Sequence, residues 1–196
     1  MTFYPHKDDW QYVLPFIAIS IVFLLTDIFV VLEKINLAYI SGRLVLEPYR
    51  VITAHFVHSN FSHLLANSGG IVVSRFFFKE LNLKNRFLFL ALTALLIPFQ
   101  TIFQWVWDIQ LTNNSYSVLV GFSGVLYGID AFVLLSAYYG KKTFLGSKIN
   151  LCSSYSVYRA SLVITILGLL WSFMPGVSFS GHLTGFISGV VLFFLG

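Results

Sequence analysis

Charged side chains are scarce in this chain of 196 residues. Asp, Glu, Lys and Arg together make up 10% of it, whereas soluble domains carry about 25%. Apolar residues make up 57%, and the mean hydropathy is +0.81. This composition excludes an ordinary soluble protein, and the length leaves no room for a separate soluble domain. We therefore predict an all-α membrane protein with a single domain over residues 1–196.

Cysteine is almost absent as well. Cys152 is the single cysteine, which excludes an intrachain disulfide framework. The first residues, MTFYPHKDDW, are polar, and the apolar run that follows them is long enough to cross a bilayer. We therefore expect no cleavable signal peptide.

Long apolar runs recur along the rest of the chain. About 20 mostly apolar residues cross a bilayer, and six runs approach this length, although the second and the sixth are short and carry polar residues. The predicted spans are residues 13–32, 61–78, 87–106, 118–139, 158–173 and 177–195. They predict a bundle of six transmembrane helices.

Lys and Arg are distributed unevenly between the two sides of this predicted bundle. With the N-terminus inside, nine of them face the cytoplasm and three face outward. The inner set is Lys7, Arg75, Lys79, Lys84, Arg86, Lys141, Lys142, Lys148 and Arg159, and the outer set is Lys34, Arg43 and Arg50. Because cytoplasmic loops are enriched in Lys and Arg, both termini are predicted to lie in the cytoplasm.

Polar residues that interrupt the apolar runs gather in three clusters. These are RVITAHFVHSNFSHLLAN at 50–67, GFSGVLYG at 121–128 and SGHLTGFISG at 180–189. Polar groups at membrane depth are costly and usually face the bundle interior or a water-filled cavity. In the predicted topology all three clusters lie at the outer ends of their spans, so they predict a single site open to the outer side.

Glycines spaced by one helical turn surround a reactive group in two of these clusters. Small residues at this spacing let two helix backbones approach closely, and on their own they indicate packing only. The glycines concerned are Gly121, Gly124 and Gly128 around Ser123, and Gly181, Gly185 and Gly189 around His182. The matching strips predict that the fourth and sixth spans pack against each other.

Close packing of these two spans would bring Ser123 within hydrogen-bond reach of His182. A serine with an adjacent base is an activated nucleophile. Tyr127 lies one turn below Ser123 and is placed to brace the imidazole ring. A lone histidine in a membrane helix is more often structural, but its shared depth with Ser123 favours a nucleophile and its general base.

The remaining cluster supplies His55, His58, His63 and Asn67. His63 and Asn67 are four residues apart and share a helix face, while His58 is expected in the loop before that helix. Three histidines allow a metal site, but the cluster has no His-Glu-x-x-His pattern, no nearby acid and no Cys ligand. The other interpretation, which we favour, is a set of donors for a developing oxyanion.

Two acidic residues interrupt the predicted spans. Asp130 follows Ser123 by seven residues, on a similar face of the fourth span, and Asp27 interrupts the first. A transporter or proton channel would use such groups as a relay. We favour a buried carboxyl bonded to hydroxyls for Asp130 and a polar contact for Asp27.

Taken together and in this order, the three clusters resemble the rhomboid family of intramembrane serine proteases. The family pattern is Trp-Arg in a loop, a His with a second His five residues on and an Asn four further, Gly-x-Ser-Gly, and a late His before Gly-x-x-x-Gly. The matching residues here are Tyr49-Arg50, His58, His63, Asn67, Gly121-Phe122-Ser123-Gly124, and His182 with Gly185 and Gly189. The main departure is Tyr in place of Trp at position 49.

The resemblance implies a six-helix fold, no metal and no organic cofactor. It implies that Ser123 is the nucleophile and His182 the general base. The other implied roles are an oxyanion pocket of His58, Asn67 and the Ser123 backbone N–H beside Gly121, Tyr127 packed on the histidine, His63 as a structural partner, and Arg50 holding the first outer loop.

The stretch TAHFVH at 53–58 and the small size further resemble the rhombosortase subgroup. That resemblance implies exported bacterial proteins with C-terminal Gly-Gly anchors as substrates. It also implies a bacterial inner membrane, with membrane-anchored proteins and lipid, not nucleic acid, as partners; the oligomeric state stays open. The alternative is a non-catalytic rhomboid-like protein that binds transmembrane helices. Such relatives typically lack the serine or the histidine, and both are present here.

Overall fold

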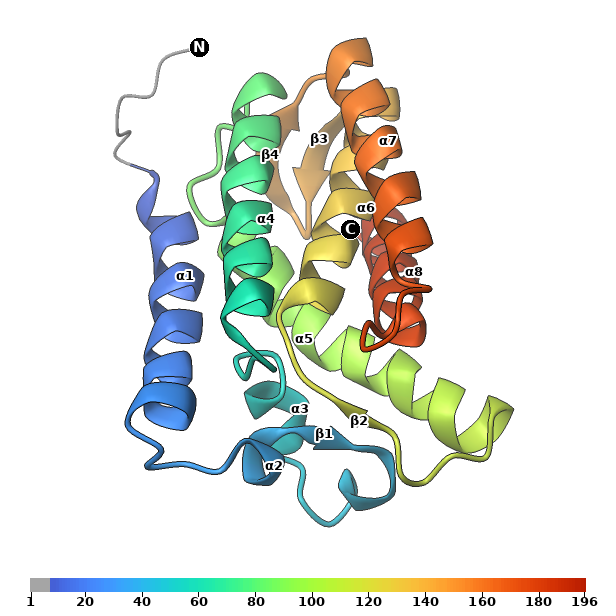
Figure 1. The fold of residues 1–196 in the computed structure, drawn as a ribbon. Helices are drawn as coiled ribbons and strands as arrows, with labels where there is room; N and C mark the ends of the chain where they lie inside the picture. The colour runs from blue at the N-terminus through green and yellow to red at the C-terminus, as the bar shows by residue number, and fades with distance from the viewer. Residues whose placement is uncertain (1–7) are drawn as a thin grey trace.

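The computed structural model describes residues 8–196, which form a bundle of helices with two short antiparallel strand pairs (Figure 1). The long helices are α1 (Trp10–Phe23), α4 (Phe61–Glu80), α5 (Leu88–Val106), α6 (Ser123–Tyr139), α7 (Tyr155–Trp171) and α8 (Phe179–Leu195). The short elements are α2 (Lys34–Leu37), α3 (Arg50–Thr53), β1 (Tyr39–Ile40), β2 (Val118–Leu119), β3 (Lys141–Phe144) and β4 (Ser147–Leu151). Lys7, which enters the sidedness prediction, lies outside the described residues.

Each predicted span overlaps one long helix, but three boundaries lie four or five residues from the predicted ones. The third helix continues past residue 106 through a π-helical turn, Trp107–Leu111. The first helix continues through a π-helical turn, Leu24–Ile28, and ends there instead of at residue 32. Val30 has a φ of 51°, which a right-handed helix does not accommodate. The fourth helix begins at Ser123 instead of residue 118, because residues 118–119 pair with β1.

The described residues include two helical stretches that are long and apolar enough to cross a membrane, Trp10–Ile28 and Leu88–Leu111. Helices α6, α7 and α8 are apolar but shorter, at 17 residues each. Helix α4 has 20 residues but is less apolar. The long helices thus lie where spans were predicted, while a count of six membrane crossings stays a prediction.

Two strand pairs correct the all-α prediction. Strands β3 and β4 form a hairpin between α6 and α7, where the sequence was expected to form a loop. Leu145 and Gly146 turn the chain with φ angles of 46° and 76°, as a two-residue hairpin turn with two positive φ angles requires. Phe144, Ile149 and Leu151 are buried, so the hairpin closes that end of the bundle.

Helix α6 lies at the centre of the bundle and packs against α4, α5, α7 and α8 (Figure 1). Its side chains Val125, Ile129, Phe132 and Val133 are fully buried. Helix α1 lies at the periphery, against α4 and α5. A residue on α6 is therefore held in place by four neighbouring helices.

Glycines permit the closest of these contacts, between α6 and α8. A Cβ atom at Gly185 would overlap the carbonyl oxygen of Gly124, and one at Gly189 would overlap that of Gly128. From the other side, a Cβ at Gly128 would lie 3.0 Å from the carbonyl oxygen of Gly185. The two backbones are therefore in direct contact, as the matching glycine strips predicted.

The segment between α1 and α4 folds under one end of the bundle (Figure 1). Arg50 is buried and donates to the carbonyl oxygens of Ile35 and Ala38. Strand β1 pairs with β2, which leads into α6, and the Gly121 backbone N–H donates to the Ala54 carbonyl at 2.9 Å. This segment thus fixes the chain just before Ser123.

Candidate active site

Ser123 is the first residue of α6, immediately after a tight turn. Gly121 has a φ of 117°, a conformation that side-chain-bearing residues rarely adopt. The first N–H groups of a helix have no acceptor within the helix and point along its axis. Ser123 therefore combines a hydroxyl with a backbone N–H directed out of the helix end.

His182 faces Ser123 from the first turn of α8. That helix starts after Ser178, whose Oγ accepts from the Gly181 N–H at 3.0 Å and caps the helix end. The His182 Nε2 atom lies 2.9 Å from the Ser123 Oγ atom. The glycine contacts between α6 and α8 set this distance, since a wider helix separation would break the hydrogen bond.

Tyr127 stacks on the imidazole of His182. The ring centroids are 4.3 Å apart and the planes are inclined by 22°. A Cβ atom at Gly168 on α7 would overlap the Tyr127 hydroxyl oxygen. The absence of a side chain at Gly168 therefore gives the tyrosine room to lie flat on the histidine.

Asn67 and His58 form a buried pair. The Asn67 Nδ2 atom is 2.7 Å from His58 Nε2, and His58 Nδ1 is 3.1 Å from the Phe56 carbonyl oxygen. Burial lowers the pKa of His58 to about 4, so the ring is neutral and carries one N–H. A carbonyl can only accept, so that proton lies on Nδ1 and Nε2 accepts from Asn67.

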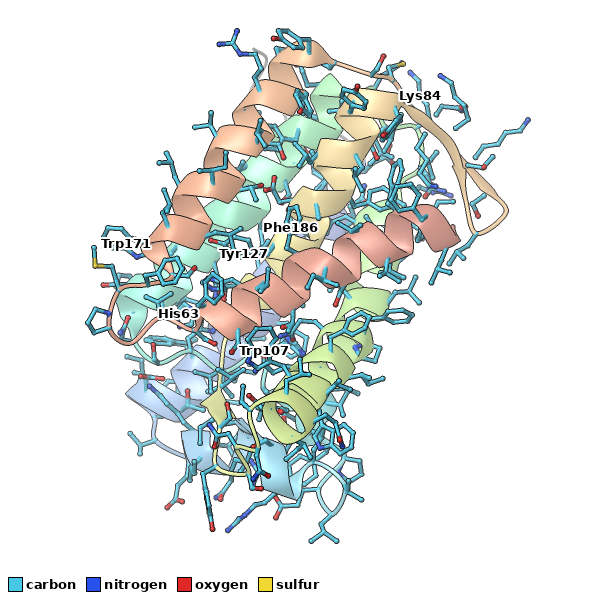
Figure 2. The ribbon with its side chains drawn as sticks, turned by 90° about the vertical axis from the view of Figure 1, so that its right-hand side faces the viewer. His63, Lys84, Trp107, Tyr127, Trp171 and Phe186 are labelled. Atoms are coloured by element: carbon cyan, nitrogen blue, oxygen red, sulfur yellow. The ribbon has the colours of Figure 1, made fainter. Side chains whose placement is uncertain are left out.

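His63 lies closer than His58 to the N-terminal end of α6, which carries Ser123. A Cβ atom at Gly121 would be 2.6 Å from His63 Nε2 and 3.5 Å from Asn67 Nδ2. His63 Nδ1 is 3.1 Å from Ser59 Oγ. Figure 2 shows the labelled His63 and Tyr127 below Lys84 and above Trp107 in this view.

The contacts of the two histidines favour roles other than the expected ones. His58 was expected to donate to an oxyanion, but its one N–H is committed to the Phe56 carbonyl. His63 was expected to be the structural partner, yet it shares the Gly121 side of the site with Asn67. The geometry favours Asn67 and His63 as the donors and His58 as the residue that orients Asn67.

The same contacts bear on the metal alternative. Both ring nitrogens of His58 are occupied by protein groups. His55 lines the cavity that Ser123 and His182 also line, but its Nε2 atom is 2.9 Å from Thr101 Oγ1 and its side chain is buried. Among residues 8–196, no group of three His, Cys, Asp or Glu side chains is arranged to hold a metal ion.

A cavity beside the Ser123–His182 pair contains polar residues that the sequence analysis missed. Gln100, Gln104 and Tyr39 line it. Gln104 donates to Ser180 and Asp108, both at 3.1 Å, and Tyr39 donates to Asp108 at 2.9 Å. The signal was present, since residues 100, 104 and 108 are polar at four-residue intervals in an apolar helix.

The two acids in the predicted spans are both hydrogen-bonded. Asp130 accepts from Ser161 at 2.5 Å and from Thr165, which confirms the expected bonds to hydroxyls, although the side chain is only partly buried. Asp27 pairs with Lys34 at 2.5 Å. These are the local polar contacts that the sequence analysis favoured over a relay.

Comparison with known proteins gives the family. The rhomboid domain family matches residues 46–196. An uncharacterised protein of Mycobacterium leprae (strain TN) is 30% identical over 148 residues, covering 72% of this chain and 53% of that protein. A protein of Acanthamoeba polyphaga mimivirus that is named as a rhomboid protein is 31% identical over 143 residues, covering 69% of this chain and 68% of that protein. The chain thus spans about half the length of the first relative and two thirds of the second.

With apolar helices and a family match over most of its length, the chain is an integral membrane protein that belongs to the rhomboid family.

Proposed function

We propose that this protein is an intramembrane serine endopeptidase that uses Ser123 as nucleophile and His182 as general base. The observation that carries the proposal is the 2.9 Å contact between Ser123 Oγ and His182 Nε2. The two groups come from different helices, and these helices are in direct contact at Gly124 with Gly185 and at Gly128 with Gly189. Such a pair meets the geometric requirement for an activated serine.

The reaction follows from these two groups. His182 Nε2 takes the Ser123 hydroxyl proton while Oγ attacks the scissile carbonyl carbon. The tetrahedral intermediate collapses, the C–N bond breaks, and His182 returns the proton to the leaving amine. Water then attacks the acyl-enzyme ester with His182 again as base, which releases a carboxylate and regenerates Ser123.

The oxyanion that forms in both steps needs hydrogen-bond donors that are already in position. We assign the Ser123 backbone N–H, Asn67 and His63 to this task, because the last two flank Gly121 next to the start of α6. The helix N-terminus adds its positive dipole end. His58 supports the pocket by holding the Asn67 amide.

Hydrolysis also requires a water molecule beside Ser123. The cavity lined by Gln100, Gln104 and Tyr39 adjoins Ser123 and His182. A polar site with several hydrogen-bonding partners is what an ordered water needs. We assign this cavity to the hydrolytic water.

The proposal includes six membrane crossings and the orientation predicted from Lys and Arg. The β3–β4 hairpin, with Lys142 and Lys148, lies at one end of the bundle, and the β1–β2 pair lies at the other (Figure 1). Strand β2 leads into α6, whose first residue is Ser123. Cytoplasmic enrichment in Lys and Arg then places the hairpin end inside. Cleavage would occur near the outer face of a bacterial inner membrane.

The substrates we propose are membrane-anchored proteins, with C-terminal Gly-Gly anchors as the preferred class. A helical segment must expose a peptide bond to be cut, and glycine weakens a helix. The test is cleavage in proteoliposomes of two tagged substrates that differ only in Gly-Gly or Leu-Leu before the anchor helix. Faster cleavage of the Gly-Gly substrate, dependent on Ser123, supports this class; equal rates leave only general membrane-anchored substrates.

The same proteoliposomes separate proteolysis from helix binding. A non-catalytic relative would retain the substrate without cutting it, and Ser123→Ala would behave like the native protein. Cleavage by the native protein and retention without cleavage by Ser123→Ala would support the protease. Activity that survives EDTA would exclude a metal-dependent reaction.

A further inference from the structure

The second ring nitrogen of His182 has its own partner, which the sequence does not single out. Ser172 Oγ lies 2.5 Å from His182 Nδ1. Ser172 is the C-cap residue of α7 and is buried, with 2% of its surface exposed. His182 is therefore held at both nitrogens, by Ser123 on one side and by Ser172 on the other.

The direction of this hydrogen bond follows from a second contact of Ser172. Its Oγ atom is 2.7 Å from the Gly168 carbonyl oxygen. A carbonyl oxygen can only accept, so the single hydroxyl proton of Ser172 points to Gly168. The contact with His182 must then be donated by the ring, which puts a proton on Nδ1.

We propose that Ser172 is a positioning residue that fixes the tautomer of His182. A neutral imidazole carries one proton, and with that proton on Nδ1 the Nε2 atom is free to accept from Ser123. This is the tautomer that a general base requires, and in serine proteases with a triad a carboxylate enforces it. Here an uncharged hydroxyl, with its own proton committed elsewhere, takes that place. The catalytic role of Ser172 rests on the proposed function, whereas the tautomer of His182 that the hydrogen bonds fix does not depend on it.

Helix α7 holds Ser172 in this position. The buried side chains of α7 are Val157, Ser161 and Thr165. Ser161 and Thr165 both donate to Asp130 on α6, and they lie on one face at a four-residue interval. Polar contacts between α6 and α7 therefore anchor the helix whose end orients the histidine.

The direct test is the tautomer itself, measured without any substrate. Protein with 15N-labelled histidine is studied by proton–nitrogen NMR at pH 8, and the His182 signals are assigned by their loss in His182→Gln. We expect one tautomer with the proton on Nδ1 in the native protein. Ser172→Ala should show a mixture of both tautomers, and Ser172→Thr, which keeps the hydroxyl, should restore the single form.

Kinetics provide the second readout. Loss of one hydrogen bond of ordinary strength should lower kcat by roughly tenfold, with KM unchanged, in Ser172→Ala but not in Ser172→Thr. Thermal unfolding of each variant separates this effect from loss of folding. A native His182 with its proton on Nε2, or a Ser172→Ala protein with native tautomer and kcat, would overturn the proposal. A native protein with the Nδ1 proton that cleaves nothing would uphold it and refute the proposed function instead.

Discussion

Gly185 on α8 lies directly against the carbonyl oxygen of Gly124 on α6, and a Cβ atom at position 185 would overlap that oxygen. Gly124 follows Ser123, and Gly185 lies three residues after His182. The contact therefore sets the separation of the two helices next to the proposed nucleophile and base.

Gly185→Ala should reduce turnover strongly although Gly185 takes no part in the chemistry. The added methyl group forces α8 away from α6, and a small misplacement of reacting groups costs on the order of 10²-fold in rate. Gly69→Ala on α4 is the matched control, because a Cβ at Gly69 meets no atom within 4 Å. Cleavage rates in proteoliposomes decide the matter; equal rates for the two variants would mean that the glycine contact does not set the dyad geometry.

Ser123→Ala and His182→Ala should each abolish cleavage, and the double variant should be no worse than either. A nucleophile and its base act as one unit, so the effects of their removal do not add. Single-turnover rates of the three variants provide the measurement. Multiplicative losses would show that the two side chains act separately.

Asn67→Ala should lower kcat by about 10²–10³-fold with little change in KM, as removal of one oxyanion donor does. His58→Ala should act through Asn67, so the double variant should match Asn67→Ala. A double-variant cycle on kcat tests this. If His58→Ala lowered kcat further in the Asn67→Ala variant, His58 would be a direct donor to the oxyanion.

Stability should fall as pH falls below about 6.5, with His55 as one cause. Burial lowers the pKa of His55 to about 4, whereas an unfolded histidine has a pKa of about 6.5. Between these values the unfolded chain binds a proton that the folded chain does not, so acid favours unfolding by up to about 1.4 kcal/mol per pH unit. Unfolding temperatures at pH 7.5 and pH 5 should therefore differ less in His55→Gln than in the native protein. The same pH dependence in both would exclude His55 as a source.

The long helices and the contact between Ser123 and His182 could be predicted because the sequence patterns that indicate them are local. Apolar runs marked the positions of the long helices, and glycines one turn apart predicted the contact between α6 and α8 that joins Ser123 to His182. The hairpin at residues 141–151 was missed, because its turn places Leu145 at a positive φ that few residues other than glycine adopt.

The histidine roles depend on geometry that the sequence only partly encodes. His63 and Asn67 share a helix face by their spacing, which agrees with their common position near Gly121. The resemblance implied the donor role for His58 instead, and it is the Phe56 carbonyl contact that favours the other assignment. Ser172 carried no signal, since a serine at a helix end is unremarkable until its partner on another helix is known.

The most direct measurement of the central claim is acylation of Ser123 by a fluorophosphonate probe, which reacts with activated serines. Purified protein in detergent is labelled and digested, and the modified peptide is identified by mass spectrometry. We predict a single labelled site at Ser123, lost in Ser123→Ala and strongly reduced in His182→Ala, with Ser136→Ala, a buried serine elsewhere on α6, as the unaffected control. Absence of labelling in a folded native protein, or labelling that persists in Ser123→Ala, would contradict the assignment of Ser123 as an activated nucleophile.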